Sequence, residues 1–239
     1  MSKKEKRLKE HGDLAVRAVC TARTRRLVEL EVFPSSVSSG SFSSNYGMGE
    51  APLTQQSPTM ARLQEALQFT RNQSLSRDSS TRIGVPFVID HEASVPELQE
   101  VEEAVRYFNV NPEQLIFHIQ KSQNDGHFCI YHVAERLRQL GAGVSVDSFI
   151  ADGKDFEVLA SPHVNFINCD KHLIKSAMQR DLAWNFVHGL VALARQTQKE
   201  VVFGGIDTKQ EFHALSQIGD VRFHGEFSRR LLRANAPES

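Results

Sequence analysis

Short apolar runs recur along this 239-residue chain, and most of them end in a side chain that can hold a metal or move a proton. Carboxylate and imidazole groups supply the ligands of many metal sites and the acids and bases of hydrolysis. If the apolar runs are parallel strands of one closed sheet, their carboxyl ends share one rim and these groups converge there. The strand-end positions, in chain order, are Glu31, Asp90, His118, Asp147, Asn168 with Asp170, Gly204 with Asp207, and His224.

A single polar residue at the end of a strand carries little weight, because strands end in loops. The ordered series carries more, although convergent carboxylates repel one another and call for a cation or a basic partner among them. One alternative is therefore a single-metal site built from Glu31, Asp90, His118 and Asp147, since mixed imidazole and carboxylate ligands suit transition metals.

The elements that must position these residues follow from the hydrophobic pattern. Strands are predicted at 14–20, 26–33, 85–90, 115–119, 144–147, 164–169, 200–203 and 221–223. Helices are predicted at 60–69, 97–108 and 128–140, as one or two helices within 171–196, and as a short helix between the last two strands. This alternation predicts an α/β fold, a modified TIM (β/α)₈-type barrel whose N-terminal strand is antiparallel. A doubly wound open sheet is the alternative, but no GxGxxG or P-loop spacing supports it.

The composition indicates how the chain is organised. Residues 1–12 are predicted to be a charged tail without the apolar stretch of a secretory signal. Residues 13–235 are predicted to form one barrel domain, interrupted at 34–58 by a loop rich in Ser, Gly and Pro.

The bulk properties exclude some function classes. The 28 basic and 29 acidic side chains nearly cancel, so we expect no nucleic-acid partner. No apolar run approaches the roughly 18 residues of a membrane span, so we expect no membrane partner. Cys20, Cys129 and Cys169 match no metal or redox spacing and are interpreted as free thiols of a cytoplasmic protein.

Six segments of the chain resemble motifs of the EAL domain family, whose active members are cyclic-di-GMP phosphodiesterases. The sequence VELEVF at 28–33 resembles the strand that bears Glu-Ala-Leu, and QLIFHIQKS at 114–122 resembles the strand ending in Leu-Glu-Ile-Thr-Glu. LGAGVSVDSF at 140–149 is similar to the segment leading into Asp-Asp-Phe, and VNFINCDKHLI at 164–174 to the strand ending in Lys-Ile-Asp. VVFGGIDT at 201–208 resembles Ala-Glu-Gly-Val-Glu-Thr, and FHG at 223–225 stands at the Gln-Gly position. The resemblance covers nearly the whole chain in the right order.

The resemblance implies a degenerate active site at the barrel mouth. Active members use two metal ions to activate the attacking water, and this chain keeps three of their acidic residues as Glu31, Asp147 and Asp170. The other positions differ: Asp90 replaces a metal-binding Asn, His118 a Glu ligand, Ser148 the metal-bridging Asp, Asn168 the Lys implicated in water activation, Gly204 a Glu, and His224 a Gln. Loss of acid–base help alone costs about 10²–10⁴ in rate. We therefore expect no catalytic residue and no hydrolysis.

The resemblance also bears on nucleotide binding. Members that bind cyclic-di-GMP usually carry an arginine two residues past the Glu-Ala-Leu triplet, where this chain has Ser35. A bidentate guanidinium is hard to replace there. The predicted mouth shows carboxylates and no identified basic residue, so a dianionic ligand would be repelled. We expect no cofactor; Mg²⁺ or Mn²⁺ and cyclic-di-GMP remain alternatives.

These observations together predict a catalytically inactive regulatory protein that acts through protein–protein contacts in bacterial signalling, in motility or biofilm control. The segment Gly204 to Thr208 reads Gly-Gly-Ile-Asp-Thr, as in small stand-alone members that bind a transcription factor and repress flagellar genes. The partner would be an unidentified regulator, contacted through the N-terminus, the Ser-rich loop or a tail bearing Arg229, Arg230 and Arg233. A cyclic-di-GMP receptor without hydrolysis and a divergent phosphodiesterase are the two alternatives.

Overall fold

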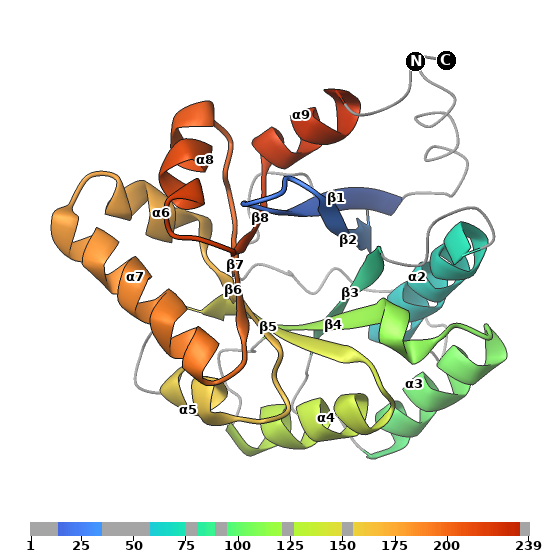
Figure 1. Ribbon diagram of the computed structural model, residues 1–239. Helices are drawn as coiled ribbons and strands as arrows, with labels where there is room; N and C mark the ends of the chain where they lie inside the picture. The colour runs from blue at the N-terminus through green and yellow to red at the C-terminus, as the bar shows by residue number, and fades with distance from the viewer. Residues whose placement is uncertain are drawn as a thin grey trace.

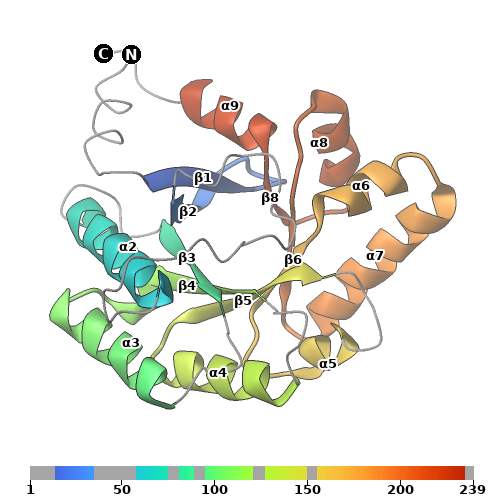
Figure 2. The same cartoon turned by 180° about the vertical axis from the view of Figure 1, so that it is seen from behind.

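A computed structural model of the chain shows an eight-stranded barrel closed on itself, with helices around its outside (Figures 1 and 2). The structure describes residues 14–34, 58–74, 81–88, 95–120, 127–149 and 155–234. The strands follow chain order around the barrel, and β1 closes the circle by pairing with β8. Strands β2 to β8 run parallel, while β1 is antiparallel to both of its neighbours. The predicted TIM-type barrel with an antiparallel N-terminal strand is confirmed, and the open-sheet alternative is wrong.

The eight strands lie within a few residues of their predicted positions. They are β1 (Leu14–Thr21), β2 (Leu27–Pro34), β3 (Arg82–Val88), β4 (Leu115–Gln120), β5 (Gly143–Phe149), β6 (Phe166–Cys169), β7 (Glu200–Phe203) and β8 (Arg222–His224). The largest difference is at β3, which begins three residues before the predicted start. Ile83 already pairs with Leu115 of β4, and the non-apolar residues Arg82 and Gly84 conceal this start in the sequence.

The helices cover the outer face of the barrel (Figure 1). They are α2 (Pro58–Ser74), α3 (Val95–Tyr107), α4 (His127–Gln139), α5 (Asp155–Ala160), α6 (Lys171–Ala177), α7 (Asp181–Gln196), α8 (Lys209–Ser216) and α9 (Glu226–Ala234), with a 3₁₀ turn, η1, at Pro112–Gln114. The segment predicted as one helix or two is two helices. The supposed C-terminal arginine tail is α9, whose Phe227 and Leu231 pack on the core one helical turn apart. None of the described helices is both long and apolar enough to cross a bilayer.

Side chains alternate between the two faces of each strand, so the barrel has an outer and an inner core. Leu115, Phe117 and Ile119 of β4 belong to the outer core, which the helices cover. The inner core is a small apolar layer of Val19, Ile116, Phe166 and Val202. Two residues further along β4 and β6 the inner face carries His118 and Asn168, and Gly204 follows directly after β7. The interior therefore changes from apolar to polar toward the carboxyl ends of the parallel strands.

Some predictions fall outside the residues that the structure describes or are only partly covered by them. The tail at 1–12 and all but the two ends of the loop at 34–58 lie outside those residues. Cys20 and Cys169 are buried and neither is in a disulfide, and burial raises the pKa of Cys20 to about 11. A thiol with a raised pKa is a poor nucleophile at neutral pH, so Cys20 acts as a small apolar side chain.

Candidate functional site

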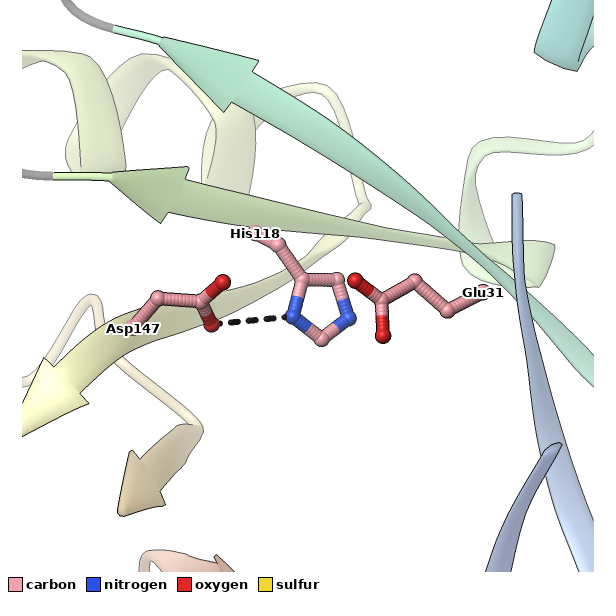
Figure 3. A group of neighbouring side chains, drawn as sticks. All are labelled: Glu31, His118 and Asp147. Atoms are coloured by element: carbon pink, nitrogen blue, oxygen red, sulfur yellow. Dashed lines mark hydrogen bonds and ion pairs between the residues drawn. The ribbon is translucent and has the colours of Figure 1, made fainter. Parts of the chain in front are cut away.

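Three of the strand-end residues point at one another inside the barrel. Glu31 comes from β2, His118 from β4 and Asp147 from β5, and one donor atom of each lies within 4.8 Å of the others (Figure 3). All three side chains are buried. Figure 3 shows the imidazole ring of His118 lying between the two carboxylates. The barrel thus brings together residues that are 87 and 29 positions apart in sequence (118 − 31 and 147 − 118).

His118 has a carboxylate at each ring nitrogen. Its Nδ1 donates to Asp147 Oδ1 over 3.1 Å, and its Nε2 donates to Glu29 Oε1 over 2.5 Å. An ionised carboxylate only accepts hydrogen bonds, so both nitrogens carry a proton and the ring is a cation. Burial would lower the pKa of His118, but Glu29, Glu31 and Asp147 together raise that pKa well above its ordinary value. His118 is therefore a positive charge fixed among acidic side chains.

Glu31 is neutralised from the antiparallel strand. Arg17 of β1 stands directly opposite Glu31 in the strand register. Its Nε donates to Glu31 Oε2 over 2.7 Å, and its Nη2 contacts the same oxygen. Burial would raise the pKa of Glu31, but the positive charges of Arg17 and His118 outweigh burial and lower this pKa. The expectation that the mouth has no basic residue is wrong, because β1 runs backward and delivers Arg17 into the interior.

Glu29 is the third buried carboxylate of this group, which we call the barrel cluster: Arg17, Glu29, Glu31, His118, Asp147 and Arg222. Arg222 of β8 lies 3.9 Å from Glu29 through Nη1, and its other nitrogens donate to the exposed Glu200 over 2.7 and 2.9 Å. The Arg222 guanidinium also lies over the ring of Phe166, 4.4 Å from its centroid. The barrel cluster thus sets three carboxylates against three cationic side chains, and its charges balance.

Gly84 of β3 makes room for the contact between Glu29 and His118. A Cβ atom at Gly84 would lie 2.3 Å from Glu29 Oε1 and 2.9 Å from His118 Nε2, closer than real Cβ contacts. The hydrogen bond between these two side chains therefore occupies space that only glycine leaves open. Neither Glu29 nor Gly84 ends a predicted strand, so the sequence did not identify either of them as a site residue. Glu29 could have been found from its spacing, since residues two apart in a strand share one face.

Three further predicted site residues, Asn168, Gly204 and His224, lie in the barrel interior and add no charge to it. Asn168 of β6 donates its amide to Asp147 Oδ1 over 3.1 Å. A Cβ at Gly204 would meet the ring of His224 at 2.9 Å from Cε1 and 3.1 Å from Nε2, so the His224 ring fills the space beside the glycine. Burial, followed by the charge of Arg17, holds the pKa of His224 well below its ordinary value. His224 is therefore neutral, in contrast to His118.

Other predicted site residues lie elsewhere or outside the description. Asp170 caps α6, where its Oδ1 accepts from His172 N over 2.7 Å, and it takes no part in the barrel cluster. Asp207 accepts from Glu226 N over 3.0 Å and lies 3.6 Å from Lys175 Nζ. Asp90 lies outside the described residues, and Ser148 is placed in β5 without a described side chain.

The ligand atoms in the barrel cluster do not suit the metal ions that are used by active members of the family that this chain resembles. Within the described residues, Glu31, His118 and Asp147 are the one group compact enough to share an ion. A histidine ligand needs an unprotonated nitrogen, and both nitrogens of His118 donate to carboxylates. Glu31 Oε2 is held by Arg17, and the buried Oε1 has no hydrogen-bond partner. Asp147 Oδ1 already accepts from His118 and Asn168, so Mg²⁺ would have to displace several of these contacts to gain the octahedral oxygen shell that it requires.

The contact between Gly204 and His224 can be tested with a double-mutant cycle. We expect Gly204→Ala to lower the free energy of unfolding by about 1–3 kcal/mol, because the new methyl group overpacks the His224 ring. In a His224→Ala background the same change should cost much less, which urea denaturation measures as a coupling energy. Gly189→Ala is the control: its Cβ meets nothing within 4 Å, so we expect a gain of up to about 1 kcal/mol. If Gly204→Ala lowered the free energy of unfolding equally in both backgrounds, the two residues would not be in contact.

The family model described as "EAL domain" matches residues 7–230. Oxygen sensor protein DosP from Escherichia coli (strain K12) is 26% identical over 136 residues, which are 56% of this chain and 17% of DosP. The chain thus spans about a sixth of that relative.

Solved structures with the same fold include the EAL domain of DcpA from Mycobacterium smegmatis. Its TM-score is 0.70 at 15% identity, and the match covers 95% of this chain and 99% of that one. A stand-alone versatile EAL protein from Vibrio cholerae O395, solved with cyclic-di-GMP bound, matches with a TM-score of 0.69 at 16% identity. That match covers 89% of this chain and 88% of the other. At such identities the similarity shows a shared barrel fold.

Proposed function

Because this chain belongs to the EAL domain family, which is related to cyclic-di-GMP phosphodiesterases, we propose that it is a non-catalytic member that regulates bacterial signalling by binding another protein. The observation that carries this proposal is the position of His118 between Glu29 and Asp147. An imidazolium there supplies the positive charge that a site of convergent carboxylates would otherwise take from a metal. The barrel cluster is then a structural feature of the interior.

Two positions that carry proton-transferring side chains in active members of the family hold residues of other types in this chain. By resemblance, the lysine position holds Asn168, whose amide does not titrate and donates to Asp147. The position of the late glutamate holds Gly204, and the ring of His224 takes up the space beside it. These two losses together remove more than the factor of about 10²–10⁴ that general acid–base catalysis supplies.

The charges of the barrel cluster also disfavour the nucleotide as a ligand. Arg17 already binds Glu31, and Arg222 already binds Glu200 and faces Glu29. A phosphodiester would have to compete with these carboxylates for the guanidinium groups. A partner protein on the outer surface meets no such competition. The Gly-Gly-Ile-Asp-Thr segment at 204–208 supports a role like that of stand-alone members that act in the cytoplasm on motility genes.

An activity assay tests the catalytic half of the proposal. We expect purified protein incubated with cyclic-di-GMP and Mg²⁺ or Mn²⁺ to form no linear product by chromatography, because neither the metal ligands nor the proton-handling groups are available. The matched variant is Asp147→Asn, which removes the acceptor shared by His118 and Asn168. Metal-dependent product that Asp147→Asn abolishes would instead establish a divergent phosphodiesterase.

Calorimetry and affinity capture test the binding half of the proposal, that the protein binds another protein and not the nucleotide. We expect no saturable heat when cyclic-di-GMP is titrated into the protein, with or without metal. Saturable binding without turnover would contradict the proposal in favour of a nucleotide receptor. A defined regulator captured from lysate of the source bacterium, and then bound by the purified protein in a one-to-one complex, is the expected positive result.

A further inference from the structure

The turn between β1 and β2, which we call the arginine turn, spans residues 22–26 and carries three arginines in four positions: Arg23, Arg25 and Arg26. It lies at the end of the barrel where the parallel strands begin, because Thr21 pairs with Arg222, the first residue of β8. The side chains of all three arginines are exposed. Within the described part of the chain, those of Arg23 and Arg25 make no hydrogen bond or ion pair.

We propose that the arginine turn is the surface through which this protein binds an acidic segment of its partner protein, whose carboxylates pair with Arg23 and Arg25. This inference rests on the proposed function for the class of partner, and it adds the surface and the charge by which that partner is recognised. The arginine turn lies at the opposite end of the barrel from Asp147 and Asn168, which stand near the carboxyl ends of their strands. Binding there leaves the barrel interior unchanged.

The backbone of the arginine turn is held in place by three hydrogen bonds. Thr21 N donates to Arg26 O and Arg25 N donates to Thr21 O, each over 3.0 Å. The buried Ala22 attaches the turn to the residue before β8, since its N donates to Val221 O over 2.8 Å. Only the side chains then remain to be ordered on binding, so little free energy is lost to ordering of the loop.

Arg25 has a backbone conformation that glycine would adopt at lower cost. Its φ is 56°, in the left-handed region that residues with a side chain rarely occupy. A strained residue that persists at an exposed turn points to a use for its side chain. The turn therefore gives up some backbone stability in order to hold a guanidinium at this position.

Phe212 of α8 positions the Arg25 side chain. The guanidinium carbon lies over the Phe212 ring, 5.2 Å from its centroid, and this ring stacks on Phe227 with centroids 4.5 Å apart. A guanidinium over an aromatic ring keeps its charge and its N–H donors. Those donors match the two oxygens of a carboxylate. The ring therefore orients Arg25 for a carboxylate without neutralising it.

Charge selects an acidic protein segment as the occupant of the arginine turn. Arginine pairs with carboxylates and is enriched where protein interfaces bind most strongly. Nucleic acid instead draws on a broad positive field, whereas the 28 basic and 29 acidic side chains of this chain cancel. Asp220, exposed in the loop before Val221, makes no ion pair with any residue that the structure describes. Arg23 and Arg25 are therefore available to the carboxylates of another protein.

Fluorescence anisotropy with a labelled peptide of alternating glutamate and serine tests this recognition. At low salt we expect saturable binding with a dissociation constant of about 100 µM, which rises as salt screens the charges. Arg23→Gln combined with Arg25→Gln should raise that constant at least about tenfold, because charge-assisted hydrogen bonds are lost. The control combines Arg229→Gln with Arg230→Gln on α9, where both arginines pair with Glu226. It removes the same charge and should change the constant less than about twofold.

Arg25→Gly tests whether the side chain is kept at the expense of the backbone. We expect this variant to unfold at a higher urea concentration than wild type, because glycine adopts the left-handed conformation freely, and yet to bind the peptide more weakly. Arg23→Gly is the matched variant: Arg23 has no positive φ, so glycine there should lower the urea midpoint. If Arg25→Gly lowered the midpoint as well, Arg25 would serve the fold through Phe212, and the inference would be wrong.

Three further results would overturn the inference. The first is peptide binding that the α9 control weakens as much as the two changes in the arginine turn. The second is an oligodeoxythymidine, or a vesicle containing phosphatidylserine, that binds through Arg23 and Arg25 more tightly than the peptide does. The third is a captured regulator that binds wild type and the Arg23→Gln, Arg25→Gln variant equally, which would leave the proposed function standing. Hydrolysis of cyclic-di-GMP would do the reverse, because it overturns the proposed function without bearing on the arginine turn.

Discussion

Replacing His118 by glutamine is expected to lower the free energy of unfolding by about 3–5 kcal/mol at neutral pH, the cost of leaving buried charges without their partner. Glutamine keeps two hydrogen-bonding ends at a similar size but carries no charge. Glu29 and Asp147 would then remain buried on either side of a neutral group. Urea denaturation followed by circular dichroism measures the difference. His132→Gln, at an exposed position of α4, is the matched control and should change stability by less than about 0.5 kcal/mol.

The pH dependence of this difference has a definite sign. The pKa of His118 is raised in the folded protein above the ordinary 6.5. The folded state therefore binds the proton more tightly than the unfolded state. The stabilisation is fully present below pH 6.5 and is lost as the pH rises toward the folded pKa, so wild type and His118→Gln should converge between neutral and alkaline pH. Added Mn²⁺ should leave the wild-type melting temperature unchanged. A difference that grows with rising pH, or a wild type strongly stabilised by Mn²⁺, would rule out a structural imidazolium.

Replacing Arg17 by glutamine is expected to have the second largest effect, a loss of about 3 kcal/mol, because it removes the partner of the buried Glu31 carboxylate. Arg106→Gln is the control: Arg106 pairs with Glu102 across one helical turn at the surface of α3, where such pairs contribute about 0.3–0.5 kcal/mol. Chemical denaturation of both variants gives the comparison. Equal losses for the two variants would show that the pair inside the barrel is no stronger than a surface pair.

Acid should diminish the Arg17 effect. The pKa of Glu31 is lowered in the folded protein below 4.5, so its ionisation stabilises the fold above that value and this contribution is lost as the pH falls through the folded pKa. Without Arg17, burial is opposed mainly by the charge of His118, so the pKa of Glu31 rises. The variant can then relieve the cost by taking up a proton at mildly acidic pH. Stability curves of wild type and Arg17→Gln should therefore converge on the acidic side, opposite to the behaviour expected for His118→Gln.

The fold could be predicted because its signal is spread over the whole chain. Eight short apolar runs at intervals suited to helical crossovers leave few architectures open, and an error of a few residues at one strand does not alter the result. The two helices that the prediction missed, α5 and α9, have six and nine residues. Over such lengths a helical period repeats too few times to stand out, and the arginines of α9 suggested a solvated tail.

The barrel cluster was only half predictable, because its partners depend on strand register. Strand ends identified Glu31, His118 and Asp147, but Glu29 lies within its strand and Arg17 lies in a strand that runs the other way. A regular hairpin with its turn at 21–25 would pair Cys20 with Arg26 and so Arg17 with Glu29. The structure instead pairs Cys20 with Leu27 and Val19 with Glu29, an irregularity that moves Arg17 opposite Glu31. This is a shift of two positions along β2: one comes from the pairing of Cys20 with Leu27, and the other from the one-residue bulge between Val19 and Cys20. Neither leaves a clear mark in the sequence, yet together they decide which carboxylate the arginine neutralises.

The packing of His224 over Gly204 also fixes the order in which the barrel could accept a side chain directly after β7. Any residue larger than glycine at position 204 meets the imidazole ring unless position 224 has first become smaller. A change of Gly204 to glutamate alone would therefore cost folding stability. The ring of His224 therefore makes position 224 the one that must change first.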